Sequence, residues 1–271
     1  MENVLCEPSP TMLNKVPLVT LYFWVIKIMA TTVGETAADF LNTKLSLGLT
    51  NTSILMAAFL IAALVGQFRK DRYVPWIYWV SVVLISVVGT LITDNITDHF
   101  GVPLQVTTAI FALALAASFA VWYAFEKTLS IHTIFTTRRE LFYWAVILFT
   151  FALGTAAGDL LAEQLKLGYL YSAMVFGAGI ALTYAAYRLF NLNAVVAFWI
   201  AYILTRPFGA SFGDLLSQPR SNGGLGLGTV GTSALFLVVI LGLVIAMTKA
   251  QRHAADKAAT TARSELPAVA P

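Results

Sequence analysis

The sequence predicts an all-α polytopic membrane protein of eight transmembrane helices, arranged as four parallel-oriented two-helix repeats with both termini in the cytoplasm. Three observations support this fold class. Of the 271 residues, 58% are hydrophobic and only 11% are charged, whereas an ordinary soluble domain has about 25% charged residues. Apolar stretches of about 20 residues, enough to cross a hydrocarbon layer about 30 Å thick, recur along the chain. One motif also occurs four times.

The apolar stretches define eight predicted spans, at about 17–41, 49–68, 75–97, 102–125, 141–162, 168–187, 194–216 and 229–248. Since the loops between them are short, we expect one bundle over 15–250, with repeats at 15–70, 71–127, 136–190 and 191–249. Residues 1–14 and 251–271 are predicted to be cytoplasmic tails, and the composition from Thr248 onward favours a flexible end. The single cysteine, Cys6, has no partner for an internal disulfide.

Basic residues are unequally distributed between the two sides of the predicted bundle. One side has Lys44, Lys166 and Arg220, and the other has twelve: Lys15, Arg69, Lys70, Arg72, Lys127, Arg138, Arg139, Arg188, Lys249, Arg252, Lys257 and Arg263. The positive-inside rule puts the richer side, with both termini, in the cytoplasm. Because this placement accounts for the net charge of +3, the charge gives no reason to expect a nucleic-acid partner.

The repeated motif is a tryptophan, a glycine ten residues later and an aspartate fifteen residues later, preceded by a small residue. Its members are Trp24, Trp79, Trp144 and Trp199; Gly34, Gly89, Gly154 and Gly209; Ala38, Thr93, Gly158 and Gly213; and Asp39, Asp94, Asp159 and Asp214. The tryptophans are 55, 65 and 55 residues apart, which indicates a hairpin that doubled and then doubled again.

This pattern resembles an uncharacterised bacterial inner-membrane protein family built of four tandem two-helix repeats, each with a characteristic tryptophan. The resemblance covers about residues 15–250. It implies the eight-helix architecture and a location in the bacterial inner membrane. It implies no activity, so the function has to be argued from the residues themselves.

On a helical projection the motif positions share one face, an arc of about 140°. A glycine and a small residue four positions apart allow close approach of helices in lipid, so we expect the glycines to pack against neighbouring helices. We expect the tryptophans to anchor the bundle in an interfacial aromatic belt, together with Tyr22, Tyr78, Tyr143 and Tyr202.

The four aspartates are candidate ion-binding residues. A carboxylate at a helix C-terminus opposes the helix dipole, so it is a poor choice for capping alone. We hypothesise that the four carboxylates converge around a pseudo-fourfold axis, where a ring of oxygen ligands would attract and coordinate a cation. Asp98 and His99 are candidate additional ligands. The alternative is that all of these are solvated end-of-helix and loop residues inherited from one ancestral hairpin.

Three charged residues, Lys27, Glu35 and Arg206, lie deeper in the predicted spans. An ionisable residue within a span normally faces an interior partner or a cavity. Lys27 and Glu35 are eight residues apart, about 12 Å along one helix, so they are too distant to pair. We therefore predict that Glu35 and Arg206 interact across the first and seventh helices, with Lys27 below them. The alternative role for this pair is helix packing alone.

Pro207 follows Arg206 and predicts a kink or break within 204–209. Broken helices at membrane depth often line substrate sites, although a plain kink is the commoner outcome. The glycine-rich stretch 221–228 is a candidate outer lid. It is not a nucleotide-binding loop, since no Gly-Lys-Ser/Thr sequence follows.

The leading functional hypothesis is a small-solute transporter or channel, for a cation. The alternative is a non-transporting membrane scaffold or sensor, in which the basic loop 127–140 and the C-terminal tail meet a cytoplasmic partner or anionic lipid. We do not expect an enzyme, because no zinc-binding helix or nucleophile elbow occurs and Gly158-Asp159 lacks the second glycine of an intramembrane aspartyl protease. No organic cofactor motif occurs, so a transported cation is the only ligand implied.

Overall fold

The computed structural model describes the backbone of residues 14–44 and 47–264 and the side chains of residues 14–42 and 47–250. In these residues the chain forms eight α-helices and no strand. The helices are α1 (Leu21–Asp39), α2 (Leu49–Phe68), α3 (Pro75–Asp94), α4 (Leu104–Glu126), α5 (Thr137–Asp159), α6 (Gly168–Leu189), α7 (Ala194–Ser217) and α8 (Gly228–Ser264). Short π-helices follow three of them: η2 (Phe40–Lys44), η3 (Asn95–His99) and η5 (Leu160–Gln164). Cys6 lies outside the described residues.

The predicted apolar stretches all form helices, and most helix ends fall within a few residues of the predicted bounds. Seven of the described helices are long and apolar enough to cross a membrane; α1, which carries Lys27 and Glu35, is not among them. Gly, Pro and Asn residues at the ends of the apolar stretches explain the precise boundaries. For example, Pro75 occupies the first turn of α3, where its missing N–H is not needed.

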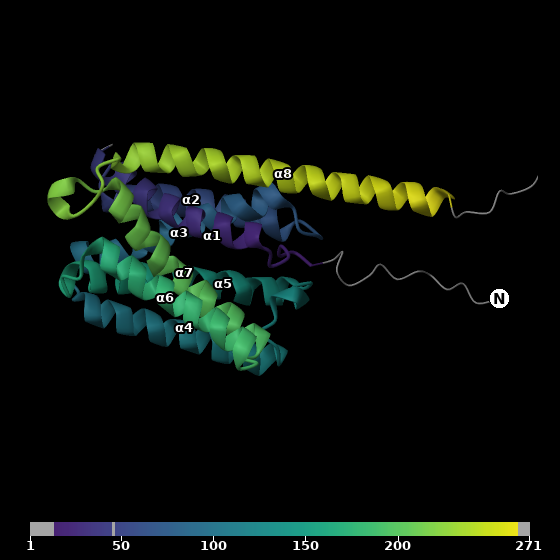
Figure 1. Ribbon diagram of the computed structural model, residues 1–271, viewed down its shortest axis with the longest axis horizontal. Helices are drawn as coiled ribbons and strands as arrows, with labels where there is room; N and C mark the ends of the chain where they lie inside the picture. Colours follow the sequence, from purple (N-terminus) through teal and green to yellow (C-terminus); the bar gives the residue numbers. More distant parts are fainter. Residues whose placement is uncertain (1–13, 45–46, 265–271) are drawn as a thin grey trace, which may run out of the picture.

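The first helices of the four repeats form a closed inner ring. Its neighbours are α1 and α3, α3 and α5, α5 and α7, and α7 and α1. Each second helix packs on the first helix of the following repeat: α2 on α3, α4 on α5 and α6 on α7. The last helix, α8, packs mainly on α1 and so completes the circle. Figure 1 shows the helices lying side by side along the long axis of the molecule.

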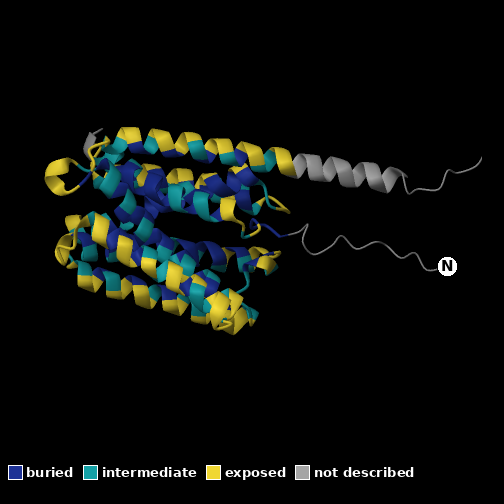
Figure 2. Cartoon of the chain, viewed as in Figure 1, coloured by how far each residue is buried: buried dark blue, intermediate teal, exposed yellow. Residues whose placement is uncertain are grey.

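Burial separates the two kinds of helix. In α3, α5 and α7 between 56% and 72% of the spanning residues are buried, whereas in α2, α4, α6 and α8 only 17% to 22% are. In Figure 2 exposed residues run along the outer helices and buried residues lie between them. Because the exposed side chains of the outer helices are largely apolar, the solvent that they fit is lipid.

The structure adds detail to three local predictions. Helix α8 continues to Ser264, so the stretch after Thr248 is helical rather than an irregular tail. Helix α7 runs unbroken through Pro207, so of the predicted kink or break the break is wrong. The glycine-rich stretch is tied to the end of α7, because the amides of Leu225 and Leu227 donate to the carbonyl groups of Leu215 and Leu216.

Candidate functional site: a polar cluster inside the ring of first helices

The motif glycines lie at the four contacts of the inner ring, as predicted for close helix packing. The α-carbon of each glycine faces the side chain seven residues after the tryptophan of the next helix. The pairs are Gly34 with Ser86, Gly89 with Phe151, Gly154 with Arg206, and Gly209 with Thr31. Since a Cβ atom on any of these glycines would overlap its neighbour, the glycines set the distance between the helices.

Arg206 forms a buried polar cluster with one residue from each of the other three repeats. Its Nη2 atom lies 2.9 Å from Glu35 Oε2 and 2.6 Å from Thr155 Oγ1, and it also contacts Thr90 Oγ1. Thr90 in turn donates to Glu35 Oε2 over 3.2 Å. The predicted contact between Glu35 and Arg206 is therefore present, and it joins α1 to α7.

Sequence reasoning missed the two threonines, although the repeat contains the signal for them. Glu35, Thr90 and Thr155 all stand eleven residues after their tryptophans, and the fourth equivalent position is Ala210. Ala210 has only a methyl group at this level of the ring. The guanidinium of Arg206, which comes from one turn earlier in α7, extends to the same level and contacts the other three residues there. A comparison of the repeats position by position would have grouped these residues.

Lys27 lies nearby and is fully buried, but it forms no ion pair among the described residues. Its Nζ atom is 3.3 Å from Thr31 Oγ1 and 4.4 Å from the ring centroids of both Phe151 and Tyr202. The guanidinium carbon of Arg206 lies 5.3 Å from the same Phe151 ring. Two cationic side chains therefore contact one aromatic ring inside the bundle, an arrangement that the ring quadrupole stabilises.

The four motif aspartates lie at one end of the inner ring, which we call the aspartate end. Asp39, Asp94 and Asp159 are the last residues of α1, α3 and α5, and a π-helix follows each of them. Asp214 is buried in the last turn of α7. Because the chain continues as a helix after the first three, these carboxylates do not occupy free helix ends. Single π-helical turns of this kind often occur at functional sites.

The aspartates act on one another electrostatically. Asp94 is within range of Asp39 and Asp159, and Asp214 is within range of Asp159 and Asp39. Glu35 is within range of all four. Where these carboxyl groups are ionised they repel one another, and a positive charge placed among them would be attracted by several at once.

These carboxylates do not form a ready-made metal site. Among the described residues, no three Asp, Glu, His or Cys side chains lie close enough together to bind one metal ion. Asp98 and His99, the predicted additional ligands, are exposed on η3. The geometry therefore does not support direct coordination of one metal ion by all four aspartates. It supports attraction of a cation at longer range.

The opposite end of the ring, which we call the tryptophan end, is filled with aromatic side chains. Trp79, Trp144 and Trp199 are at most 5% exposed, and the hydroxyl groups of Tyr78 and Tyr143 are 2.5 Å apart. The predicted interfacial belt is therefore wrong for these residues, because they pack against one another inside the bundle. The residue before each tryptophan is also aromatic, a signal that sequence reasoning missed: Phe23, Tyr78, Tyr143 and Phe198.

A buried ion pair ties the start of the described chain to the tryptophan end. Lys15 Nζ lies 2.7 Å from Glu140 Oε2 and donates to the carbonyl group of Phe68 over 3.2 Å. Gln67 Nε2 donates to the other carboxylate oxygen of Glu140 over 3.1 Å. Lys15 was counted above only as a cytoplasmic positive charge, and its structural partner on α5 was not predicted.

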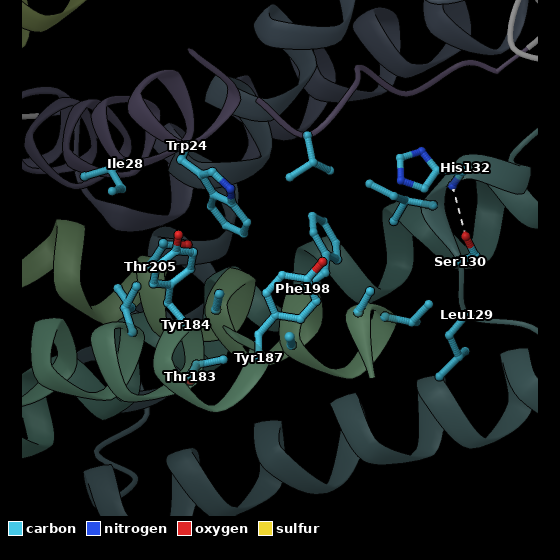
Figure 3. A pocket seen from close by; sticks show the side chains of 17 residues that line it. Trp24, Ile28, Leu129, Ser130, His132, Thr183, Tyr184, Tyr187, Phe198 and Thr205 are labelled. Atoms are coloured by element: carbon cyan, nitrogen blue, oxygen red, sulfur yellow. Dashed lines mark hydrogen bonds between the residues drawn. The ribbon is translucent and has the colours of Figure 1, made fainter. Parts of the chain in front are cut away.

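A pocket of about 570 Å³ opens at the tryptophan end between α1, α6 and α7. Figure 3 shows Trp24, Phe198, Tyr184 and Tyr187 around it, with His132 at one side. No Asp, Glu, Lys or Arg is among the described residues that line it. The pocket also explains why Trp24 is less buried than the other motif tryptophans. Its apolar lining suits part of a lipid or another apolar group, and none of the four residues of the polar cluster lines it.

A family model described as "Repeat of Unknown Function (DUF347)" matches the chain four times, at residues 22–73, 77–128, 142–192 and 197–253. Each match contains one copy of the tryptophan motif. No curated protein and no solved structure matches the chain.

Proposed function

The chain belongs to the family described as "Repeat of Unknown Function (DUF347)", and from the geometry of its inner ring we propose that it is a transporter or channel for a small solute that carries positive charge. The family description gives no activity, so the proposal depends on the site. The observation that supports it most strongly is the placement of five carboxyl groups, the four motif aspartates and Glu35, toward one end of a closed ring of helices.

The arrangement along the ring supports a path for a solute. A cation near the aspartate end meets the four aspartates first and Glu35 next, four residues deeper in α1, or about 6 Å. Burying carboxylates inside a membrane bundle is costly, and such residues commonly mark ion or substrate pathways. Beyond Glu35 the way is closed by Arg206, Phe151 and the aromatic side chains of the tryptophan end. A cation would therefore be attracted at the aspartate end of this path, whereas side chains close the path at the tryptophan end.

The same geometry favours a hydrated cation or an ammonium group over a dehydrated metal ion. A dehydrated divalent ion needs several oxygen ligands converging at about 2.0–2.6 Å. No group of three Asp, Glu, His or Cys side chains in the described part of the chain comes close enough for that. A hydrated ion or an ammonium group requires only attraction and hydrogen bonding at longer range.

We also propose that α1 crosses the membrane with the other seven helices, despite its charged residues. It occupies a place in the inner ring equivalent to those of α3, α5 and α7, and Gly209 packs on it in the way that the other motif glycines pack on their neighbours. With eight spans the four repeats would be parallel, and the unequal distribution of basic residues supports our proposal that both termini lie in the cytoplasm, with the bundle in the bacterial inner membrane. The aspartate end then faces outward.

The proposal is tested by flux measurements on the full chain reconstituted in liposomes. We expect uptake of labelled small ammonium ions, and we expect its loss when all four motif aspartates are changed to asparagine. Asp71→Asn, at an exposed position between α2 and α3 at the opposite end of the ring, is the matched control and should leave uptake unchanged. Undiminished uptake by the fourfold variant would refute the role of the aspartates. Absence of any uptake by the unmodified chain would favour the alternative of a membrane scaffold or sensor.

A further inference from the structure

The buried polar cluster has more hydrogen-bond donors than acceptors. Of the nitrogen atoms of Arg206, only Nη2 is bonded; Nε and Nη1 are buried and have no partner among the described residues. The hydroxyl group of Tyr202 is buried and likewise unpartnered. Lys27 Nζ has three hydrogens and a single oxygen contact, Thr31 Oγ1. Arg206, Lys27 and Tyr202 are all completely buried.

Such a surplus is costly inside a membrane protein. Buried polar groups in folded proteins nearly always have partners, since an unpartnered donor loses its hydration and gains nothing in return. The cost is higher for charged donors, and within the described part of the chain Glu35 is the only carboxylate that forms a hydrogen bond with Arg206 or Lys27. Glu35 bonds only to Nη2 of Arg206, so Nε and Nη1 of Arg206 and Nζ of Lys27 have no carboxylate partner among the described residues. The missing partner is therefore an acceptor with negative charge.

The buried donors that lack acceptors lie next to the carboxylates. Arg206 is eight residues before Asp214 in α7, about 12 Å along the helix, and Glu35 lies near the middle of that interval at about 6 Å. A solute entering from the aspartate end would thus meet carboxylates first and free N–H donors immediately beyond them. Two opposite charges separated by a few ångströms on one small molecule would satisfy both layers.

We propose that the inner ring binds a small zwitterion, with its ammonium group at Glu35 and the aspartates and its carboxylate at Arg206 Nε and Nη1 and at Lys27. The inference rests on the proposed function and specifies its substrate class. Guanidinium is well suited to this role, because it presents several N–H donors in a fixed plane and keeps its charge in a buried site. Tyr202 contributes a neutral donor beside Lys27.

The test uses three molecules of matched size: β-alanine, which carries both charges, n-propylamine, which carries only the ammonium group, and propionate, which carries only the carboxylate. Glycine and γ-aminobutyrate vary the separation of the two charges. Binding to the purified full chain in nanodiscs is measured by equilibrium dialysis of labelled ligand. We expect at least one zwitterion to bind about tenfold or more tightly than either single-charge molecule, because each half then contributes a charge-assisted hydrogen bond.

Substitutions test which residues form the proposed zwitterion site. Arg206→Lys keeps the charge but removes the Nε and Nη1 donors, so the preference for the zwitterion over n-propylamine should fall by about tenfold. Lys27→Met should reduce the same preference and provides a second test if Arg206→Lys folds poorly. Arg188→Gln, in the last turn of α6 and exposed, is the control and should bind as the unmodified chain does. The elution volume of each variant on size-exclusion chromatography reports its folding.

Each outcome decides between the proposals. Equal binding of β-alanine and n-propylamine, or binding of propionate alone, would overturn the zwitterion site. Binding of none of the three zwitterions would overturn it as well, and the donors would then be satisfied by water. Uptake of n-propylamine in liposomes without any preference for zwitterions would refute this inference while leaving the proposed function intact.

Discussion

Removing one charge from the Arg206–Glu35 pair is the perturbation with the largest expected effect on folding. The Arg206 side chain is fully buried, that of Glu35 is 8% exposed, and their nitrogen–oxygen distance is 2.9 Å. Loss of one partner from a buried ion pair leaves the other charge uncompensated and costs about 3–5 kcal/mol. We expect Arg206→Met and Glu35→Gln each to lower the free energy of unfolding by about this amount.

In a chain of this size about 1 kcal/mol shifts the melting temperature by roughly 2–4 °C, so each single variant should melt roughly 6–20 °C lower. The double variant removes both charges together, and its loss should be smaller than the sum of the single losses by about 2 kcal/mol or more. The assay is thermal unfolding of the four purified proteins in one detergent, followed by intrinsic fluorescence. The expected non-additivity measures the interaction itself.

Arg138→Gln is the control for this experiment. Arg138 also pairs with a carboxylate, that of Glu126, but its own side chain is 62% exposed. An ion pair held at the surface contributes little, so the melting temperature should change much less than for Arg206→Met. Strictly additive losses in the Arg206 and Glu35 variants, or single variants as stable as Arg138→Gln, would refute the account of the central cluster.

Three further experiments, with five variants, test the packing of the bundle. Gly89→Ala would put a methyl group 2.7 Å from a side-chain carbon of the neighbouring helix and 3.2 Å from its backbone. It should cost about 1–3 kcal/mol in a thermal unfolding assay, whereas Gly242→Ala, with open space around it, should be neutral or stabilising. Glu140→Gln should destabilise the tryptophan end, because it leaves a buried lysine uncompensated; an unchanged melting temperature would contradict this. Ala201→Leu should be tolerated, since it extends into the 570 Å³ pocket, whereas Ala156→Leu, at a fully buried position, should lower expression of folded protein.

The helices were predictable from the sequence because their boundaries depend on local properties. Apolar length fixes the spans, and residues such as Pro75 and Gly168 mark where helices begin. The contact between Glu35 and Arg206 was predictable for a similar reason. A charge in a span needs a partner, and the repeat gave both residues their depth and their face of the helix.

The closure of the ring was not predictable from local properties. Nothing in one repeat specifies that α8 packs on α1 rather than on its own hairpin partner α7, since both pairings bury apolar surface. The packing of the ring also determines whether the tryptophan side chains face the lipid or the inside of the bundle. Aromatic residues near a helix end fit an interfacial belt equally well, and only the packing of four helices turned Trp79, Trp144 and Trp199 inward.

The unbroken α7 and the extended α8 show how tertiary context overrides local signals. A proline in a helix removes one hydrogen bond, but neighbouring helices can hold the remaining ones in place. Pro207 packs against Gly154, where no side chain blocks its ring. The Ala-rich composition after Thr248 is typical of helices as well as of tails, and here it continues the helix to Ser264.

The central claim is that a solute reaches the buried polar cluster along the inner ring from the aspartate end. The most direct test replaces Thr155 with cysteine in a chain whose only native cysteine has been removed by Cys6→Ser. A membrane-impermeant thiol reagent added at the aspartate end of the reconstituted protein should modify Thr155→Cys and block uptake. Protection of this site under conditions in which Asp98→Cys, at an exposed position of the same end, reacts fully and uptake continues would contradict the account.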